Sequence, residues 1–175
     1  MKSPILFIWM LAGLFAPHLA AESPVPFLAG NWKLLGDRGT DLSPWKTLDV
    51  AIAVDRDRVV IRRHFASGDR AIDTEMSLDV SNPVNIVPVP SWVDNRHIGA
   101  YIGGDRSEHI HAAWIDDGRI LRTDADLVLD TQQGARKVYI LTDYKISPSG
   151  NQLTIVELRS TRPIPIVYVL QRSRP

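Results

Sequence analysis

Residues 119–146 read RILRTDADLVLDTQQGARKVYILTDYKI, in which apolar and polar side chains alternate along two runs. The first run spans 119–130, the second spans 136–146, and Gln133-Gly134 lies between them. Successive side chains of a strand point to opposite faces, so this pattern is typical of antiparallel strands that bury only one face. The segment therefore predicts a β-hairpin with one buried face and one solvated face.

The same alternation continues on both sides of this hairpin. Further runs with strand character lie at 30–35, 48–54, 58–65, 70–80, 97–103, 108–115, 152–160 and 164–172. Turn-forming residues separate them, as at Ser67-Gly68-Asp69 and Asp116-Asp117-Gly118, and such residues supply the backbone conformations that tight hairpins require. No window of helical length repeats its apolar residues with a helical period.

A long run of short antiparallel strands tends to curl and close, because closure removes the exposed edges. The sequence therefore predicts an all-β fold, an antiparallel up-and-down β-barrel of about 8–10 strands, with a β-sandwich as the alternative. Residues 81–92 interrupt the rhythm. Pro83, Pro88 and Pro90 cannot donate hydrogen bonds to a central ladder, so this segment is expected at an edge or in a crossing loop.

The N-terminus has the organisation of a secretory signal peptide. Lys2 supplies a positive charge, an apolar run follows from Ile5 to Phe15, and Leu19-Ala20-Ala21 form a small-residue exit. The apolar run is shorter than the ~20 residues that span a bilayer. We therefore expect a signal peptide at 1–21, an extended lead-in at 22–29 and a single domain at 30–175. Such a protein would be periplasmic or secreted, with no integral membrane segment after cleavage, and a retained membrane anchor is the alternative.

Composition excludes several classes of function. The chain has 20 basic and 20 acidic residues, whereas nucleic-acid binders usually carry a clustered basic excess. It contains no cysteine, which excludes disulfides, zinc-thiolate sites and a thiol nucleophile. It also lacks a P-loop, a Gly-x-Ser-x-Gly elbow and a His-Glu-x-x-His motif. No cofactor is expected, and a binding protein is favoured over an enzyme.

One motif carries a family resemblance. Gly30-Asn31-Trp32 opens the first expected strand, and Arg172 ends the last one. This pairing resembles the pattern of small secreted bacterial lipocalin-like (calycin-type) proteins, in which Gly-x-Trp opens the barrel. The resemblance implies that Trp32 plugs the closed end and that Arg172 stacks on its indole as a cation–π pair. It also implies a small apolar ligand in the mouth of the barrel.

Candidate ligand-binding residues are charged or aromatic side chains at unusual places. Alternation puts Arg63 on the apolar face of 58–65 and Glu157 on that of 152–160. His64, the next residue after Arg63, is a further candidate and shares the opposite face with Val60. A buried Arg63–Glu157 pair could recognise the carboxylate or polar head of a ligand. The alternative is that both snorkel at strand ends. Trp92 and Arg96 lie in or near the irregular segment and could cap a ligand, or Trp92 could anchor the loop to the barrel wall.

A metal site is a further hypothesis. His109 and His111 are two positions apart on an expected strand, so their side chains share a face and could bind zinc or copper. The alternative is a solvated strand face, because Ile110, Ala112 and Trp114 form the more apolar side.

Three functions fit these observations. The leading one is an exported binding protein that holds a small hydrophobic or amphipathic ligand in the barrel. The second is a ligand-free envelope interaction or stress protein with a filled core. The third is a barrel enzyme, which would require His64, Glu157 or Asp124 to converge on one cavity.

Overall fold

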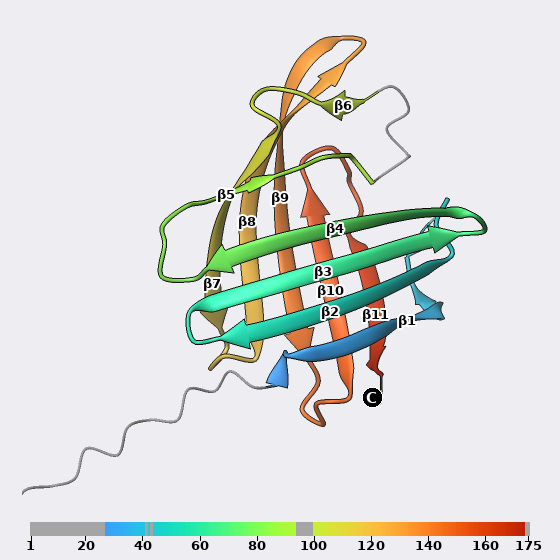
Figure 1. The fold of residues 1–175 in the computed structure, drawn as a ribbon, viewed down its shortest axis with the longest axis vertical. Helices are drawn as coiled ribbons and strands as arrows, with labels where there is room; N and C mark the ends of the chain where they lie inside the picture. The colour runs from blue at the N-terminus through green and yellow to red at the C-terminus, as the bar shows by residue number, and fades with distance from the viewer. Residues whose placement is uncertain (1–26, 41, 43, 94–99, 174–175) are drawn as a thin grey trace, which may run out of the picture.

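The computed structural model describes residues 27–40, 42, 44–93 and 100–173, which form a single antiparallel sheet (Figure 1). Its strands are β1 (Gly30–Gly39), β2 (Thr47–Asp55), β3 (Arg58–Ser67), β4 (Arg70–Asp79), β5 (Asn85–Pro88), β6 (Tyr101–Ile102), β7 (Ser107–Ile115), β8 (Ile120–Thr131), β9 (Gly134–Ile146), β10 (Gln152–Arg159) and β11 (Ile166–Arg172). Their spatial order is β4-β3-β2-β1-β11-β10-β9-β8-β7-β5, and β6 pairs with β8. The predicted all-β barrel is confirmed, with eleven strands and no α-helix in the described ranges.

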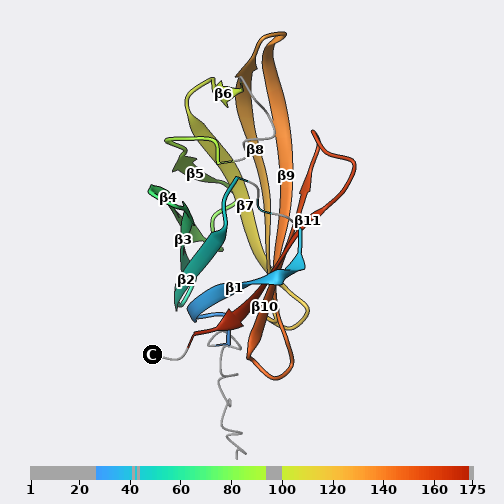
Figure 2. The same cartoon turned by 90° about the vertical axis from the view of Figure 1, so that its right-hand side faces the viewer.

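The alternation of side chains explains why the sheet closes around a core. Leu121, Leu127, Val138 and Tyr144 are all at most 2% exposed and come from the inward faces of β8 and β9. Figure 2 shows the sheet curving around the interior, with β2–β4 on one side and β8–β11 on the other. Because the two sides belong to one continuous sheet, the fold is a barrel and not a sandwich of two sheets.

Strand boundaries differ from the expected ones at identifiable places. β1 continues to Gly39 because its register against β11 shifts between Leu34 and Gly39, and such an irregularity lets a strand bend and go on pairing. β11 begins only at Ile166, since Pro165 has no backbone N–H to give to the ladder. The expected strand at 97–103 lies partly outside the described residues, and β6 covers Tyr101–Ile102.

Trp32, the third residue of β1, is 1% exposed. Its Nε1 donates to the carbonyl oxygen of Leu28 at 3.1 Å. Arg172 lies over the indole, with its guanidinium carbon 4.1 Å from the ring centroid, which is the contact that the Gly-x-Trp resemblance implied. Arg172 also donates to the carbonyl oxygens of Gly150 at 2.8 Å and Ala29 at 2.7 Å. The cation is therefore fixed to two segments of chain as well as to the ring.

Gly30 makes this arrangement possible. Its φ of +142° lies in a region that side-chain-bearing residues rarely adopt, and a β-carbon there would collide with the Arg172 guanidinium. The positive φ therefore favours glycine at the first position of the Gly-x-Trp motif, and the absence of a side chain there leaves room for Arg172.

The barrel does not close completely between β4 and β5, which are the two ends of the strand order. At one end of this gap the Asn85 side chain joins the strands, because its Oδ1 accepts from the Asp79 N–H at 2.8 Å and its Nδ2 donates to the Asp79 carbonyl at 3.1 Å. The side-chain amide thus takes the place of a backbone peptide in the ladder. Residues 81–92 were expected at an edge, and β5 is the edge strand that they contain.

The register of the β3–β4 hairpin shows which backbone groups face the gap. Ser67 and Arg70 pair across a two-residue turn, so they form a hydrogen-bonded pair, and such pairs alternate along an antiparallel ladder. The residues of β4 whose N–H and C=O point away from β3 are therefore Ala71, Asp73, Glu75, Ser77 and Asp79. The contact between Asp79 and Asn85 agrees with this assignment.

Amide hydrogen exchange followed by NMR tests that assignment. The amides of Ala71, Asp73, Glu75 and Ser77 are expected to exchange about 100-fold faster than those of Ile72, Thr74 and Met76, because only the second set donates to β3. Val60 and Ile61 of β3 serve as controls, since β3 has a partner strand on each side and both amides should be protected. Uniform protection along β4 would contradict the open edge.

Among the residues that the structure describes, no helix combines the length and apolar character needed to cross a bilayer.

Candidate functional site

The barrel contains a cavity of about 100 Å³ that opens beside the gap between β4 and β5. Inward side chains of β3, β4, β7, β8, β9 and β10 line it together with residues 87–93. Its inward polar and charged side chains are Arg63, Thr74, Ser91, Trp92, Glu108, Thr123, Thr142, Tyr144, Glu157 and Arg159. Glu75 of β4 also borders the cavity, but its side chain lies on the outer face and is 54% exposed. The rest of its wall is apolar and includes Met76, Val87 and Ile140. The cavity is thus a small apolar space with charged groups on one side.

Arg63 is the central charged group. It lies in β3 on the same face as Ile61 and Phe65, which are buried, so alternation carries its guanidinium into the barrel. Its Nη2 donates to the Tyr144 hydroxyl, and its guanidinium carbon lies 5.5 Å from the centroid of that ring. Its Nε is buried, and no described residue accepts a hydrogen bond from it. Arg63 therefore has one donor left over inside the protein.

The ionisation of these groups follows from their burial. Burial opposes the charge on Arg63, but Tyr144 and Glu157 outweigh it and hold the pKa of the guanidinium above its ordinary value. Burial raises the pKa of the Tyr144 phenol, although neighbouring Arg63 opposes that shift. Tyr144 is therefore uncharged at neutral pH and acts as a hydrogen-bond acceptor, which leaves Glu157 as the anion that balances Arg63.

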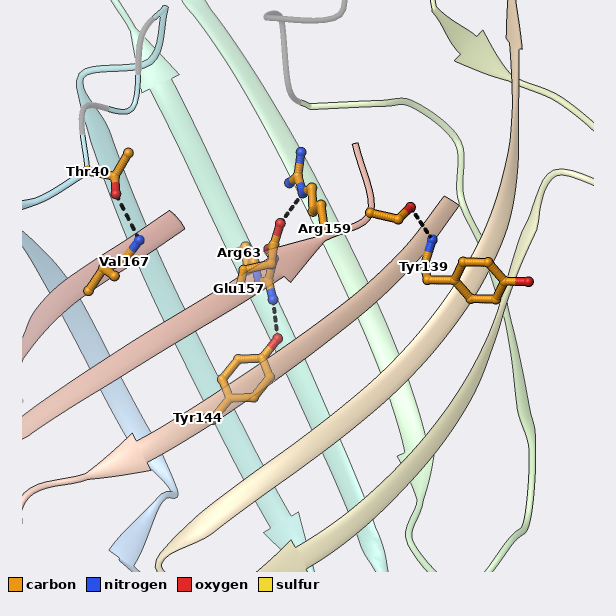
Figure 3. Close-up of polar contacts among 8 residues, drawn as sticks. Thr40, Arg63, Tyr139, Tyr144, Glu157, Arg159 and Val167 are labelled. Atoms are coloured by element: carbon orange, nitrogen blue, oxygen red, sulfur yellow. Dashed lines mark hydrogen bonds and ion pairs between the residues drawn. The ribbon is translucent and has the colours of Figure 1, made fainter. Parts of the chain in front are cut away.

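Glu157 and Arg159 extend the group along β10. Their side chains are 4% and 6% exposed, and Arg159 Nε donates to Glu157 Oε1. The guanidinium carbon of Arg159 lies 4.8 Å from the centroid of the Trp92 ring. Figure 3 shows the polar side chains in a row, from Tyr144 through Arg63 and Glu157 to Arg159. One carboxylate thus lies between two guanidinium groups.

Glu108 of β7 is a second acidic group in the wall of the cavity. Burial raises the pKa of its carboxyl above the ordinary value, Arg63 opposes the shift, and Glu157 adds to it. Glu108 therefore takes up a proton at a higher pH than an exposed glutamate does.

Only some of the ligand-binding residues predicted from the sequence lie at the cavity. Arg63, Glu157 and Trp92 all line the cavity. His64 lies on the outer face instead, where its Nδ1 is 2.7 Å from Asp73 Oδ1. Arg96 lies outside the described residues.

The two histidines of the metal hypothesis lie on the outer surface. His109 is 3.4 Å from Asp105 and 3.7 Å from Asp126, and His111 is exposed opposite Asp124. Within the described ranges, no three histidine, cysteine or acidic side chains are grouped closely enough to hold a metal ion. The set required by the enzyme hypothesis is also divided, because Glu157 points inward while His64 and Asp124 are exposed.

Sequence reasoning missed three residues of the site: Tyr144, Glu108 and Arg159. Alternation from Glu157 would have placed Arg159 on the same inward face. Tyr144 was recognisable as inward-facing but not as the partner of Arg63, because β3 and β9 are distant in sequence and meet only across the barrel. No local signal marks Glu108.

No protein-family model matches this chain, and no curated protein matches its sequence. Solved structures do match its shape. Secretory abundant heat soluble protein 4 from Ramazzottius varieornatus superposes with a TM-score of 0.52 at 10% identity, over 84% of this chain and 95% of that one. A secretory abundant heat soluble (SAHS) protein from the same organism gives a TM-score of 0.53 at 9% identity, over 87% and 100% of the two chains.

The likeness is one of fold. At 9–10% identity the superposition shows a shared barrel architecture. It does not indicate which side chains each protein places in the interior. The row of charged groups described above is therefore a property of this chain's own residues.

Proposed function

We propose that this domain is a binding protein that holds a small amphipathic molecule with an anionic head in the barrel, where Arg63 receives the head group. The observation that carries the proposal is the buried Nε of Arg63, which has no acceptor among the described residues. Leaving a buried donor unsatisfied costs about 1–3 kcal/mol, and more for a charged group. A bound carboxylate or similar anion would remove that cost.

The size of the cavity limits the ligand. Its volume of about 100 Å³ is below the roughly 300–1,000 Å³ of pockets that enclose drug-sized molecules. It has room for an anionic head and a short apolar chain. A longer chain would project through the opening beside residues 87–93. Short-chain carboxylates are therefore the ligand class that this interior fits best.

Export and kinship belong to the same proposal. We propose that residues 1–21 direct the protein to the periplasm or the exterior, and that the domain is a lipocalin-like relative of the small secreted barrels. The Gly30-Asn31-Trp32 motif with Arg172 stacked on the indole supports the kinship. The Lys2 and Ile5–Phe15 pattern supports export.

Calorimetric titration with a series of short-chain carboxylates tests the binding function. Arg63→Met keeps an unbranched apolar stem but removes the charged guanidinium, so we expect affinity to fall about 10- to 100-fold, the range of one charge-assisted hydrogen bond. The matched alcohols should bind as weakly to the wild type. The control is Arg62→Met, because Arg62 is adjacent in sequence but points outward, with its side chain 65% exposed.

Two results would contradict the binding function. One is the absence of saturable binding of any carboxylate to the wild type. The other is equal loss of affinity in Arg62→Met and Arg63→Met, because a general effect of surface charge would then explain the binding.

A ligand-free stress or interaction protein is the second candidate, favoured by the small volume of the cavity. The structural neighbours are named as secretory abundant heat soluble proteins. Native mass spectrometry of the protein taken from its own host separates the two candidates. A discrete added mass that organic extraction removes favours the ligand carrier, and a bare polypeptide mass favours the second candidate.

A further inference from the structure

The free edge of β4 faces the gap in the barrel. Backbone N–H and C=O groups of Ala71, Asp73, Glu75 and Ser77 point away from β3, and all four residues are exposed. Within the described ranges, the only hydrogen bonds across this edge are those of Asp79 to the Asn85 side chain. Four successive pairing positions are therefore open, enough for a short added strand.

Residues 88–90, on the other side of the gap, have no donor for these positions. Pro88 and Pro90 have no backbone N–H, and the N–H of Val89 is directed to the Arg106 carbonyl at 2.9 Å. Residues 88–90 thus offer no donor to β4. Because residues 88–90 lack these donors, they do not pair with β4. The edge of β4 thus stays available to a strand from another molecule.

The gap also leads into the interior. Thr74 and Met76 of β4 line one side of the cavity, and residues 87–93 line the other. A strand added to β4 would continue the alternation of the sheet, so the side chains that it places beside Thr74 and Met76 would point into this opening. Apolar side chains fit there, because Met76, Val87 and Ile110 form the nearby wall.

We propose that the edge of β4 binds an extended peptide of a partner protein as an additional strand, and that this peptide alternates apolar and basic residues. The basic residues follow from the outer face. Positions paired directly with Asp73 and Glu75 would lie beside two carboxylates whose side chains are 79% and 54% exposed. Each carboxylate already contacts a residue of β3, with His64 2.7 Å from Asp73 and Arg62 2.6 Å from Glu75, and keeps its gap side open to a further cation. Opposite charges across a strand pair stabilise the pairing.

The same carboxylates argue against a second copy of this chain as the occupant. Antiparallel pairing of two β4 edges would bring Asp73 and Glu75 of one molecule next to those of the other. Like charges on neighbouring strands destabilise such pairing, and edge charges of this kind are a known protection against self-association. A basic peptide meets the edge without this repulsion.

Fluorescence anisotropy with labelled octapeptides tests the proposal, using the whole protein at physiological ionic strength. An octapeptide of alternating valine and lysine should bind about tenfold more tightly than a peptide of the same composition arranged in two blocks, and more tightly than alternating valine and glutamate. Asp73→Lys combined with Glu75→Lys should reverse the preference between the lysine and glutamate peptides. Asp37→Lys combined with Asp124→Lys is the control, because it makes the same change of charge at exposed positions on β1 and β8.

Amide exchange of the wild-type protein provides a second measurement that needs no variant. Bound peptide should slow exchange at Ala71, Asp73, Glu75 and Ser77 and leave the other edge of the sheet unchanged. Equal affinity for the alternating and block peptides, equal loss in the two double variants, or unchanged exchange at β4 would overturn the proposal. Protection of the same amides by dimerisation without peptide would overturn it too. None of these results depends on whether carboxylates bind beside Arg63.

Discussion

Trp32→Ala is expected to lower the free energy of unfolding by about 3–5 kcal/mol, the range for removing a large buried aromatic side chain. The indole is 1% exposed. Its removal leaves a cavity, deprives the Leu28 carbonyl of its donor, and exposes the Arg172 guanidinium that lies 4.1 Å from the ring centroid. Urea unfolding followed by circular dichroism measures the loss.

Trp32→Phe is the matched variant, because it keeps an aromatic ring under Arg172 but loses the Nε1 donor. We expect it to lose about 1–2 kcal/mol, the value of one buried hydrogen bond together with a small change of volume. A loss below about 1.5 kcal/mol for Trp32→Ala would mean that the contacts of the indole with Leu28 and Arg172 contribute little to stability.

Glu157→Gln is expected to destabilise the protein by about 3–5 kcal/mol, because removing one partner of a buried ion pair leaves an uncompensated charge. Here two guanidinium groups depend on one carboxylate, since Arg159 Nε donates to Glu157 Oε1 and Arg63 lies on its other side. Glutamine has nearly the same shape, so the loss measures the charge and not the packing. Thermal and urea unfolding at neutral pH provide the measurement.

The control for Glu157→Gln is Asp143→Asn on the outer face. Asp143 also binds an arginine, with Arg122 Nε and Nη2 donating to its two oxygens at 2.7 and 2.8 Å. That pair is solvated, so its loss should cost at most about 1 kcal/mol. Similar losses in both variants would show that the interior is as well screened as the surface and would remove the reason for an anionic ligand.

The fold could be predicted because a strand that buries one face has apolar residues at every second position of its sequence. Each strand of the β8–β9 hairpin repeats its apolar residues at every second position, and the contact of Arg172 with Trp32 is the one that the Gly-x-Trp resemblance implied. The same alternation serves a barrel and a sandwich equally, so the sequence left both open. The gap was not predictable, since it depends on how Asn85 meets Asp79 across a break in the ladder.

The candidate site could be predicted in part, for the same reason. Arg63 and Glu157 were recognisable because each is a charge on an otherwise apolar face, a conflict that alternation exposes. Tyr144, Glu108 and the stacking of Arg159 on Trp92 depend on which strands face each other across the interior. His64 was predicted wrongly to join the site because it is adjacent to Arg63 in sequence. Adjacent residues of a strand point to opposite faces, and His64 lies on the outer face.

The pairing of β1 with β11 governs when the molecule can fold. The first strand is hydrogen-bonded to the last one, so a chain that is still being synthesised lacks the partner for one edge of β1 until residues 166–172 have been added. Sheets dominated by such distant contacts fold slowly, in roughly milliseconds to seconds. The barrel therefore completes itself only after the whole domain has been made.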